Sequence, residues 1–336
     1  MRRLAASIRT THATLAPRLA DCPGVNAAVL HEHGQPPRYG PFEDPDPQPD
    51  TVVVDVAAAG LHHLDLLKAS GSFYMGPPQL PSAVGTDGVG RLADGRRVYF
   101  DETVAPFGSM AERALARETA LFEFDDGLDD VTAAALGNTG LGAWLAVSWR
   151  SGLEEGDTVL VLGCGAFGSL AVQIAKLHGA GRVVAADRGG ERLERLLEHG
   201  ADATVALDEE DDLAAAYRTA AKGDLDVTID TLWGAPATAA IEAAGRFARH
   251  VQVGHVAGPT ITLPAPALRS VSLDLRGFRV DLPPPEMRRQ GFLDLTRHVA
   301  ARDISVNVEA IPLEQVGTAW ERQRRAEGGA KLVLVP

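Results

Sequence analysis

Three closely spaced glycines have a pattern that suits the binding of phosphates. Gly163, Gly165 and Gly168 follow an apolar, strand-like run in GxGxxG spacing, with Ala166 and Phe167 between the last two. The first glycine permits a tight turn, the second lets the backbone approach a pyrophosphate, and the third lets a helix pack closely on a strand. The free N–H groups and the positive dipole end of that helix then face the phosphates. The pattern therefore predicts a dinucleotide-binding site.

An acidic residue follows at the end of the next strand-like run. Asp187 lies about 20 residues after Gly168, where a carboxylate accepts hydrogen bonds from the adenosine ribose. A carboxylate there repels a 2′-phosphate and favours NAD(H), whereas a guanidinium at Arg188 can bind that phosphate. The alternative for Asp187 is a cap for the helix that follows. We expect NAD(H) or NADP(H), with NAD(H) preferred.

The segment around this turn alternates between strands and helices. Such a rhythm predicts a doubly wound parallel sheet with helices on both faces. The expected strands cover residues 159–162, 183–186, 204–207, 227–232 and 251–253, and the expected helices cover residues 169–177, 191–198, 211–221 and 237–244.

The part before this segment is typical of a small β-rich domain. Strands are predicted at residues 26–31 and 51–59, and the many prolines of residues 35–50 exclude regular structure there. A helix is predicted to start at His62, with Asp65 reaching back to its first N–H group as in a capping box.

A third region, residues 129–149, is predicted to be helical but interrupted by Gly137 and Gly140. Near the end of the chain we expect a helix at residues 287–300 and a strand at residues 331–335. These elements would flank the parallel sheet on both sides in the sequence.

Composition narrows the class of partner. The chain has 336 residues, of which 45% are hydrophobic and 23% charged, and its net charge is −13. That charge excludes nucleic acid or an anionic membrane surface as the main partner, and no apolar run reaches the length of a membrane span. Two cysteines suit a reducing cytoplasm, where Cys164 would be a small turn residue. Residues 1–24, which resemble a transit segment, are expected to be a disordered extension.

Five segments, taken in order, resemble the medium-chain dehydrogenase/reductase superfamily and its zinc-independent quinone oxidoreductase branch. They are AAAGLHHLDLLKASG, LPSAVGTDGVGRL, DDVTAAALGNTGLGAWLAV, VLGCGAFGSLAVQIAKLHGA and GGAKLVLVP. The resemblance implies an α/β fold in which a GroES-like β-barrel domain (residues 25–130 and 277–336) carries an inserted Rossmann domain (residues 131–276). The active site would lie in the cleft between them.

The resemblance also allows a prediction of whether the protein binds a catalytic zinc. Zinc-dependent relatives hold a catalytic zinc with cysteine, histidine and cysteine, and the corresponding positions here are His62, Thr86 and Asn138. Thr86 and Asn138 are poor zinc ligands, and two cysteines cannot form a four-cysteine structural lobe. The ten histidines include no HExxH or HxxxH pair. We therefore expect no zinc.

Further site residues are implied by position in the family. Asn138 and Thr139 would lie against the nicotinamide, or else form a turn, and Gly254 and Gly277 would let the backbone approach the ring or serve only in packing. Tyr74 falls near a tyrosine that lines the cleft in relatives, although its loop is one residue longer here.

His62 is the third candidate catalytic residue, beside Tyr74 and Asn138. It would donate a hydrogen bond to the substrate oxygen or to the nicotinamide ribose, giving activity that declines as pH rises, or else it only caps its helix.

The resemblance implies an NAD(P)H-dependent reductase of a quinone or an α,β-unsaturated carbonyl compound, acting on a small molecule in the cytoplasm. The alternatives are a zinc-independent alcohol or ketone dehydrogenase and a non-catalytic dinucleotide-binding protein. We also expect a homodimer joined through strand-like apolar segments within residues 261–275.

Overall fold

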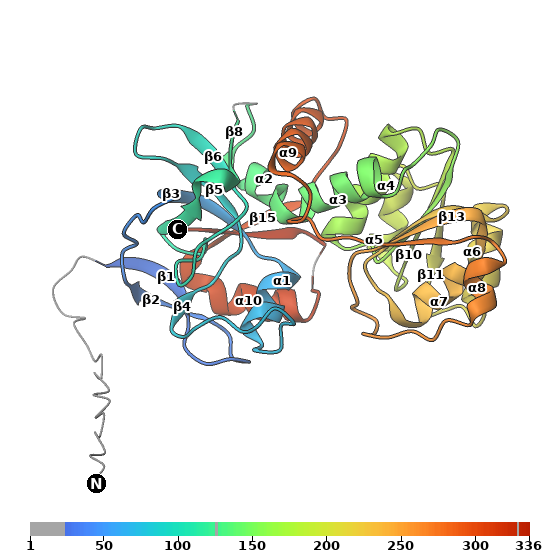
Figure 1. Cartoon of the computed structure of the whole chain (residues 1–336), viewed down its shortest axis with the longest axis horizontal. Helices are drawn as coiled ribbons and strands as arrows, with labels where there is room; N and C mark the ends of the chain where they lie inside the picture. The colour runs from blue at the N-terminus through green and yellow to red at the C-terminus, as the bar shows by residue number, and fades with distance from the viewer. Residues whose placement is uncertain (1–23, 125–126, 328) are drawn as a thin grey trace, which may run out of the picture.

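The computed structural model describes residues 24–124, 127–327 and 329–336. The extension predicted over residues 1–24 lies outside them, apart from Gly24. The molecule is elongated, with a mixed sheet region at one end, a parallel sheet at the other, and helices α2 (Asp130–Ala135) and α3 (Gly142–Leu145) between them (Figure 1). Among the described residues, no helix is long and apolar enough to cross a membrane.

The parallel sheet has the strand order β11-β10-β9-β12-β13-β14. In sequence order this is 3-2-1-4-5-6, and every neighbouring pair is parallel. The order reverses between β9 and β12, which leaves a crevice for a ligand beyond their carboxyl ends. The strands are β9 (Thr158–Leu162), β10 (Arg182–Asp187), β11 (Ala203–Ala206), β12 (Leu225–Asp230), β13 (Ala244–Gln252) and β14 (Asp274–Gly277).

Alternating side chains of β9 explain why both faces are covered. Val159 and Val161 join the apolar cluster that includes α3 and α4 (Ala166–Leu177), while Leu160 and Leu162 join the cluster that includes α6 (Leu213–Ala221) and α7 (Gly234–Glu242). A strand that is apolar on both faces must be covered on both, so its sequence pattern fixes a central position in the sheet.

The mixed region unites both ends of the described chain. Its larger sheet has the order β15-β16-β3-β5-β6-β8, with β7 also paired to β3, and a smaller sheet has the order β2-β1-β4. The predicted fold class, with a parallel sheet inserted into a β-rich unit, is confirmed. The strands are β1 (Val25–Leu30), β2 (Arg38–Phe42), β3 (Thr51–Gly60), β4 (Ser82–Ala83), β5 (Gly88–Arg91), β6 (Arg97–Phe100), β7 (Arg113–Arg117), β8 (Leu121–Glu123), β15 (Val308–Pro312) and β16 (Lys331–Val335).

The prediction that residues 35–50 lack regular structure is wrong. They contain β2, whose Pro41 lies opposite Asn26 of β1. Because β2 is the edge strand of its sheet, a residue without an N–H group is tolerated there.

The predicted interruption of the third region is also wrong. The chain stays helical from α2 into α3 through a wider π-helical turn at Gly137–Leu141, in which Leu141 N donates to Leu136 O at 2.9 Å. Gly137 and Gly140 are needed for close contacts instead. A Cβ atom on Gly137 would lie 2.1 Å from Asp87 Oδ2, and one on Gly140 would lie 2.9 Å from the Leu295 side chain.

Most of the segment predicted to supply an edge strand, residues 261–275, is not extended. It includes the short helix α8 (Ala265–Arg269), which begins at two prolines, and only its last residues enter β14 at the sheet edge. The remaining helices are α1 (His63–Ala69), α5 (Glu191–Glu194), α9 (Pro285–Ala300) and α10 (Val316–Arg324).

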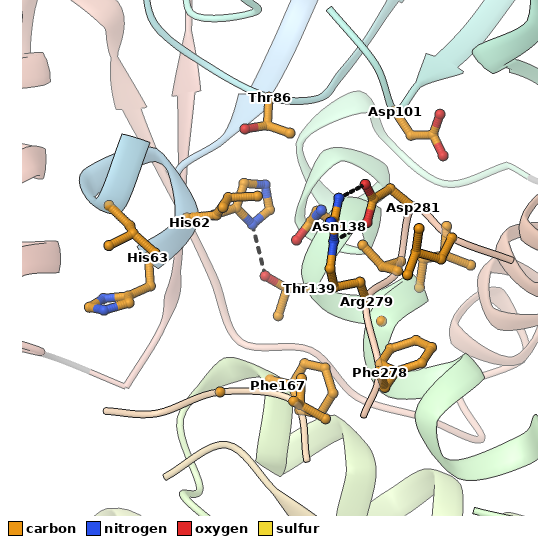
Figure 2. Close-up of a pocket in the computed structure, with 18 of the residues that line it drawn as sticks. His62, His63, Thr86, Asp101, Asn138, Thr139, Phe167, Phe278, Arg279 and Asp281 are labelled. Atoms are coloured by element: carbon orange, nitrogen blue, oxygen red, sulfur yellow. Dashed lines mark hydrogen bonds and ion pairs between the residues drawn. The ribbon is translucent and has the colours of Figure 1, made fainter. Parts of the chain in front are cut away.

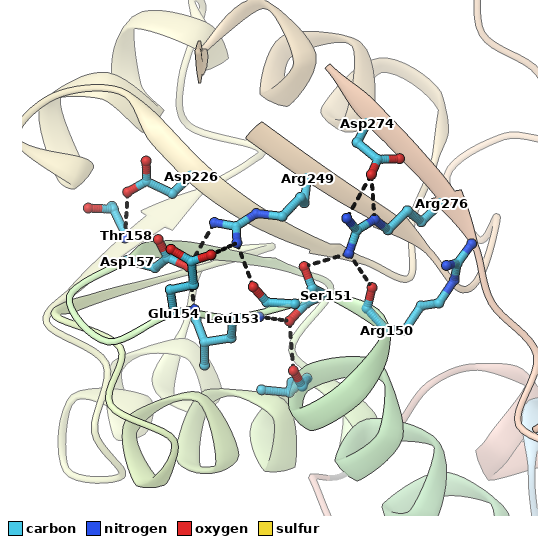
Figure 3. A network of polar contacts seen from close by, with 12 residues as sticks. Arg150, Ser151, Leu153, Glu154, Asp157, Thr158, Asp226, Arg249, Asp274 and Arg276 are labelled. Atoms are coloured by element: carbon cyan, nitrogen blue, oxygen red, sulfur yellow. Dashed lines mark hydrogen bonds and ion pairs between the residues drawn. The ribbon is translucent and has the colours of Figure 1, made fainter. Parts of the chain in front are cut away.

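Two arginines fasten the β13–β14 edge to the turn that leads into β9 (Figure 3). Arg249 Nη2 donates to Asp157 Oδ2 at 2.8 Å, and Arg276 Nη1 donates to the carbonyl oxygens of Arg150 and Ser151 at 2.8 and 2.9 Å. These bonds connect the start of the sheet to the end of the connecting helix.

Candidate active site

A cavity of about 1070 Å³ is lined by residues of both sheet regions. Of the predicted site residues, it is lined by His62, Tyr74, Asn138, Thr139, Phe167 and Gly254. In Figure 2 the side chains of Thr86, His62, Asn138 and Thr139 surround one space, with Phe167 and Phe278 on the side of the parallel sheet. The structure therefore brings His62 and Asn138 together, whereas Tyr74 lines the same cavity at a distance from them.

The glycine turn has the geometry that its spacing predicts. Gly163 has φ +84°, which favours glycine, and a Cβ atom on Gly168 would lie 2.0 Å from Gly163 O. Gly165 is exposed, and a Cβ atom there would meet nothing within 4 Å. α4 begins at Ala166, so the N–H groups of its first turn lie next to that open space. The N–H groups at the start of α4 and the open space at Gly165 together suit the binding of a pyrophosphate.

Cys164 of this turn is fully buried, and burial raises the pKa of its thiol far above the usual value. It packs as a small turn residue and holds no reactive thiolate.

Asp187 ends β10 beside the turn but is already engaged. Its Oδ2 accepts a hydrogen bond from Cys164 N at 2.8 Å and forms an ion pair with Arg192 Nη2 at 3.0 Å. Its Oδ1 accepts a hydrogen bond from the backbone N of Arg188 at 2.8 Å. The Arg188 side chain is exposed. The Arg192 guanidinium thus lies against the single carboxylate that was expected to repel a 2′-phosphate, and Arg188 follows that carboxylate in the sequence.

His62 has hydrogen-bond partners on both ring nitrogens and is 3% exposed. Nε2 lies 2.5 Å from Asp87 Oδ1, and Nδ1 lies 2.8 Å from Lys331 Nζ and 2.9 Å from Thr139 Oγ1. A carboxylate only accepts and an ammonium only donates, so Nε2 carries the proton and Nδ1 is the acceptor. As predicted, Asp65 Oδ2 accepts from His62 N at 2.8 Å and caps α1.

Asp87 is the centre of this buried network. It is fully buried, and its Oδ2 accepts from Tyr99 OH at 2.9 Å and from Asn138 N at 2.6 Å. Burial by itself would raise the pKa of Asp87, but His62, the Asn138 amide and Lys331 outweigh it and hold that pKa below its usual value. Asp87 is therefore a carboxylate that positions His62 and the π-helical turn.

Lys331 balances this carboxylate from the other side of His62. It is 4% exposed, donates to Leu61 O at 2.7 Å, and does not line the cavity. Burial lowers the pKa of Lys331 to about 8, against the opposing effect of Asp87 and Asp65. The ammonium is thus retained at neutral pH and lost in mildly alkaline solution.

Opposite this network, Tyr74 and Arg279 meet at the mouth of the cavity. Tyr74 is 68% exposed, and the Arg279 guanidinium lies 5.9 Å from the centre of its ring. Arg279 also forms an ion pair with Asp281, as Figure 2 shows. Tyr74 therefore lies at the rim and does not contact His62 or Thr139.

The side chains at the expected zinc positions do not fit a metal ion. Thr86 donates its hydroxyl proton to Asp65 Oδ1 at 2.7 Å and accepts from Lys68 Nζ at 3.0 Å, and both ring nitrogens of His62 are bound to protein groups. A cation next to the Lys68 ammonium would be repelled. In the part of the chain that the structure describes, no three His, Cys, Asp or Glu side chains form a metal-binding group.

Gly254 and Gly277 both line the cavity, but in different ways. A Cβ atom on Gly254 would lie 2.6 Å from Thr231 O, whereas one on Gly277 would meet nothing within 4 Å. Gly254 is thus required by packing, and Gly277 leaves open space.

Sequence reasoning missed Lys68, Asp87 and Lys331. Lys68 follows Asp65 by three residues, which places these two on one face of α1. Asp87 and Lys331 lie inside two of the five segments that carry the family resemblance. A charged residue within such a largely apolar segment was the signal that could have pointed to them.

Comparisons with known proteins agree with this architecture. The family model for zinc-binding dehydrogenases matches residues 166–296. An alcohol dehydrogenase of Geobacillus stearothermophilus is 26% identical over 346 residues, which cover 92% of this chain and 99% of that protein. Quinone oxidoreductase-like protein 2 of Mus musculus is 27% identical over 241 residues, covering 68% of each chain.

Among solved structures, the fold is similar to that of Escherichia coli quinone oxidoreductase complexed with NADPH. The TM-score is 0.81 at 19% identity, with 93% of this chain and 99% of that chain covered. At this identity the likeness concerns the fold.

Proposed function

Because the chain belongs to the medium-chain dehydrogenase/reductase superfamily and resembles its quinone oxidoreductase-like members, we propose that it is a zinc-independent NAD(P)H-dependent reductase of a quinone or an α,β-unsaturated carbonyl compound. The observation that carries the proposal is a single cavity with hydrogen-bond donors on one side, a dinucleotide turn beside the other, and side chains at the expected metal positions that do not suit zinc.

The cofactor would be held by the turn from Gly163 to Gly168. The open space at Gly165 and the first N–H groups of α4 would receive the pyrophosphate. When bound, a reduced nicotinamide supplies a hydride. The binding of NADPH by the Escherichia coli enzyme of the same fold supports this assignment.

The charges beside Asp187 support NADP(H) over the expected NAD(H). Arg192 neutralises the carboxylate, and the exposed Arg188 has no side-chain hydrogen bond or ion pair with another described residue. Guanidinium groups bind phosphate in a bidentate manner, so this pair would receive a 2′-phosphate.

Thr139 would bind the substrate oxygen. Its hydroxyl shares His62 Nδ1 with the Lys331 ammonium, and a neutral imidazole nitrogen has one lone pair there. While Lys331 donates to that lone pair, the Thr139 proton is free to point into the cavity. The side chain of Asn138 is half-buried, and its carboxamide group makes no hydrogen bond to another described residue. Its NH₂ group offers a second donor in the same space.

A conjugated acceptor suits this site because it needs little activation. As hydride arrives at a quinone or enone, the new charge spreads over the conjugated system, and hydrogen-bond donors of the protein can stabilise it without a metal ion. A simple ketone needs a stronger electrophile, which zinc supplies in other enzymes.

One alternative has a specific observation in its favour. The similarity to an alcohol dehydrogenase supports a zinc-independent alcohol or ketone dehydrogenase, with His62 in the proton path. A non-catalytic dinucleotide-binding protein is the remaining alternative.

Oxidation of NADPH and NADH with a panel of quinones, enones and simple ketones separates the three. Turnover with conjugated acceptors alone is the expected result. Turnover with ketones alone supports the dehydrogenase, and cofactor binding without turnover supports the non-catalytic protein.

A further inference from the structure

Lys68 extends from α1 into the cavity that the proposed function assigns to the substrate. Its half-buried side chain donates to Thr86 Oγ1 at 3.0 Å. An ammonium has three N–H donors, and the other two have no acceptor among the described residues. The side chain is therefore held in place while most of its donors stay unused.

The charges of the cavity single out this lysine. Arg279 is paired with Asp281, Arg288 with Asp101, and Glu102 with Arg117. Lys68 has no carboxylate within ion-pair distance in the described parts of the chain. Asp65, the nearest acid in its network, is occupied by His62 N and the Thr86 hydroxyl. The cavity thus contains one positive charge without a direct counter-ion.

Thr86 fixes where that charge lies. Its hydroxyl proton goes to Asp65, so its lone pair must face Lys68. Thr86 itself faces the same space as His62, Asn138 and Thr139 (Figure 2). Lys68 and Thr139 thus line the same cavity, with Thr86 between Lys68 and Asp65 in the hydrogen-bond chain.

We propose that Lys68 is a catalytic residue that binds the substrate oxygen as it becomes negatively charged. The inference rests on the proposed reductase function. A C–H bond forms at the substrate carbon that receives the hydride, the π electrons shift to the oxygen, and the nicotinamide is oxidised. The resulting enolate pairs with the ammonium and then takes a proton from solvent; with a quinone substrate, the protonated product then tautomerises to the hydroquinone. Lys68 thereby provides the electrophile that a metal ion provides elsewhere.

A phenol probe tests this without turnover. 4-Nitrophenol is added to the protein in the presence of NADP⁺, and ionisation of the bound phenol is followed by its visible absorbance. We expect the wild type to lower the pKa of the bound phenol by about one unit, as an opposite charge within a few ångström does. Lys68→Met should lose this shift and Lys68→Arg should keep most of it. Lys222→Met, which removes an exposed lysine elsewhere, is the charge-matched control.

Kinetics provide the second test. With a quinone that the wild type reduces, Lys68→Met should lower kcat about 100-fold, because the oxyanion forms only in the transition state, while the dissociation constant of NADPH stays unchanged. Ethylammonium added to Lys68→Ala should restore part of the rate. A purely structural lysine would not allow such rescue.

The outcomes are distinct. Equal ionisation of nitrophenol by the wild type and by folded Lys68→Met overturns the role of Lys68, as does a rise in KM with kcat unchanged. A wild type that shifts the phenol pKa but reduces no acceptor supports Lys68 as an oxyanion site and rejects the proposed reductase function. Thermal melting checks that each variant is folded.

Discussion

Lys331 Nζ lies 2.8 Å from Nδ1 of His62, and this contact decides which way the Thr139 hydroxyl can point. Both groups compete for one imidazole lone pair. A protonated Lys331 occupies it and leaves the Thr139 proton available to a substrate, whereas a neutral Lys331 competes weakly and lets the hydroxyl turn towards His62. The protonation of a residue outside the cavity thus controls a donor inside it.

This contact predicts how activity depends on pH. Burial lowers the pKa of Lys331 to about 8, so the ammonium is present below that pH and is lost above it. We expect kcat/KM for the quinone to fall as pH rises through about 8. Lys331→Met should have low activity at every pH, and its kcat/KM should not fall as pH rises through about 8.

Two further variants check the origin of this pH dependence. Thr139→Val should abolish the pH dependence together with most of the activity, since the competing hydroxyl is gone. His62→Asn should also lose the pH dependence, because the shared imidazole nitrogen is removed. A pH profile that is the same in Lys331→Met and in the wild type would show that another group titrates.

The open space at Gly165 predicts a variant that folds but does not bind cofactor. A side chain there meets no protein atom within 4 Å, so Gly165→Val should melt near the wild-type temperature while losing NADPH affinity. Gly317→Val, whose Cβ atom also meets open space in α10, is the matched control and should bind normally. Unchanged affinity in Gly165→Val would reject the turn as the pyrophosphate site.

The Arg192–Asp187 ion pair predicts a change in cofactor preference. Arg192→Ala removes a phosphate donor and leaves the carboxylate uncompensated, so the ratio of NADPH to NADH affinity should fall at least about tenfold, the worth of one charge-assisted hydrogen bond. Fluorescence titration measures both affinities. Arg195→Ala, an exposed neighbour, should leave the ratio unchanged. If the wild type already prefers NADH and Arg192→Ala does not alter this, the original preference for NAD(H) stands.

The donor set around Thr86 predicts a protein without stoichiometric zinc. Elemental analysis of the purified protein should find far less than one zinc per chain, and a chelator should not alter its activity or melting temperature. About one zinc per chain would mean that Lys68 moves away and that Thr86 and His62 rearrange.

The edge strand β14 predicts a homodimer. It is the last strand of the parallel sheet, and Leu275 on it is an exposed apolar residue. Light scattering at micromolar concentration should give twice the chain mass of 35.4 kDa. Leu275→Lys should shift the protein towards monomer. A monomeric wild type would contradict the prediction.

Sequence could predict those features that depend on neighbouring residues. The glycine turn and the Asp65 cap rest on short spacings, which is why both appear in the structure as expected. The strand at Pro41 and the π-helical turn at Gly137 were mispredicted because an edge position and a neighbouring carboxylate decide them. The domain boundaries at residues 130 and 277 stay predictions.

The contacts of the buried network around His62 could not be predicted from local sequence patterns. His62 meets Asp87, Lys331 and Thr139 only because three separate segments pack around it. No periodicity links them. A buried charge inside an apolar strand, such as Lys331 in β16, is the one feature that could have suggested a hidden partner.

The position of β16 between β15 and β3 has a consequence for biosynthesis. Leu61 is made 270 residues before Lys331, the residue that bonds to it. At bacterial or eukaryotic translation rates, synthesis reaches β16 on the order of tens of seconds after β3, and one edge of β3 stays unpaired during that time. During that interval it can recruit another nascent chain, so we expect yields to improve with slower initiation, lower temperature or a chaperone that shields the exposed edge.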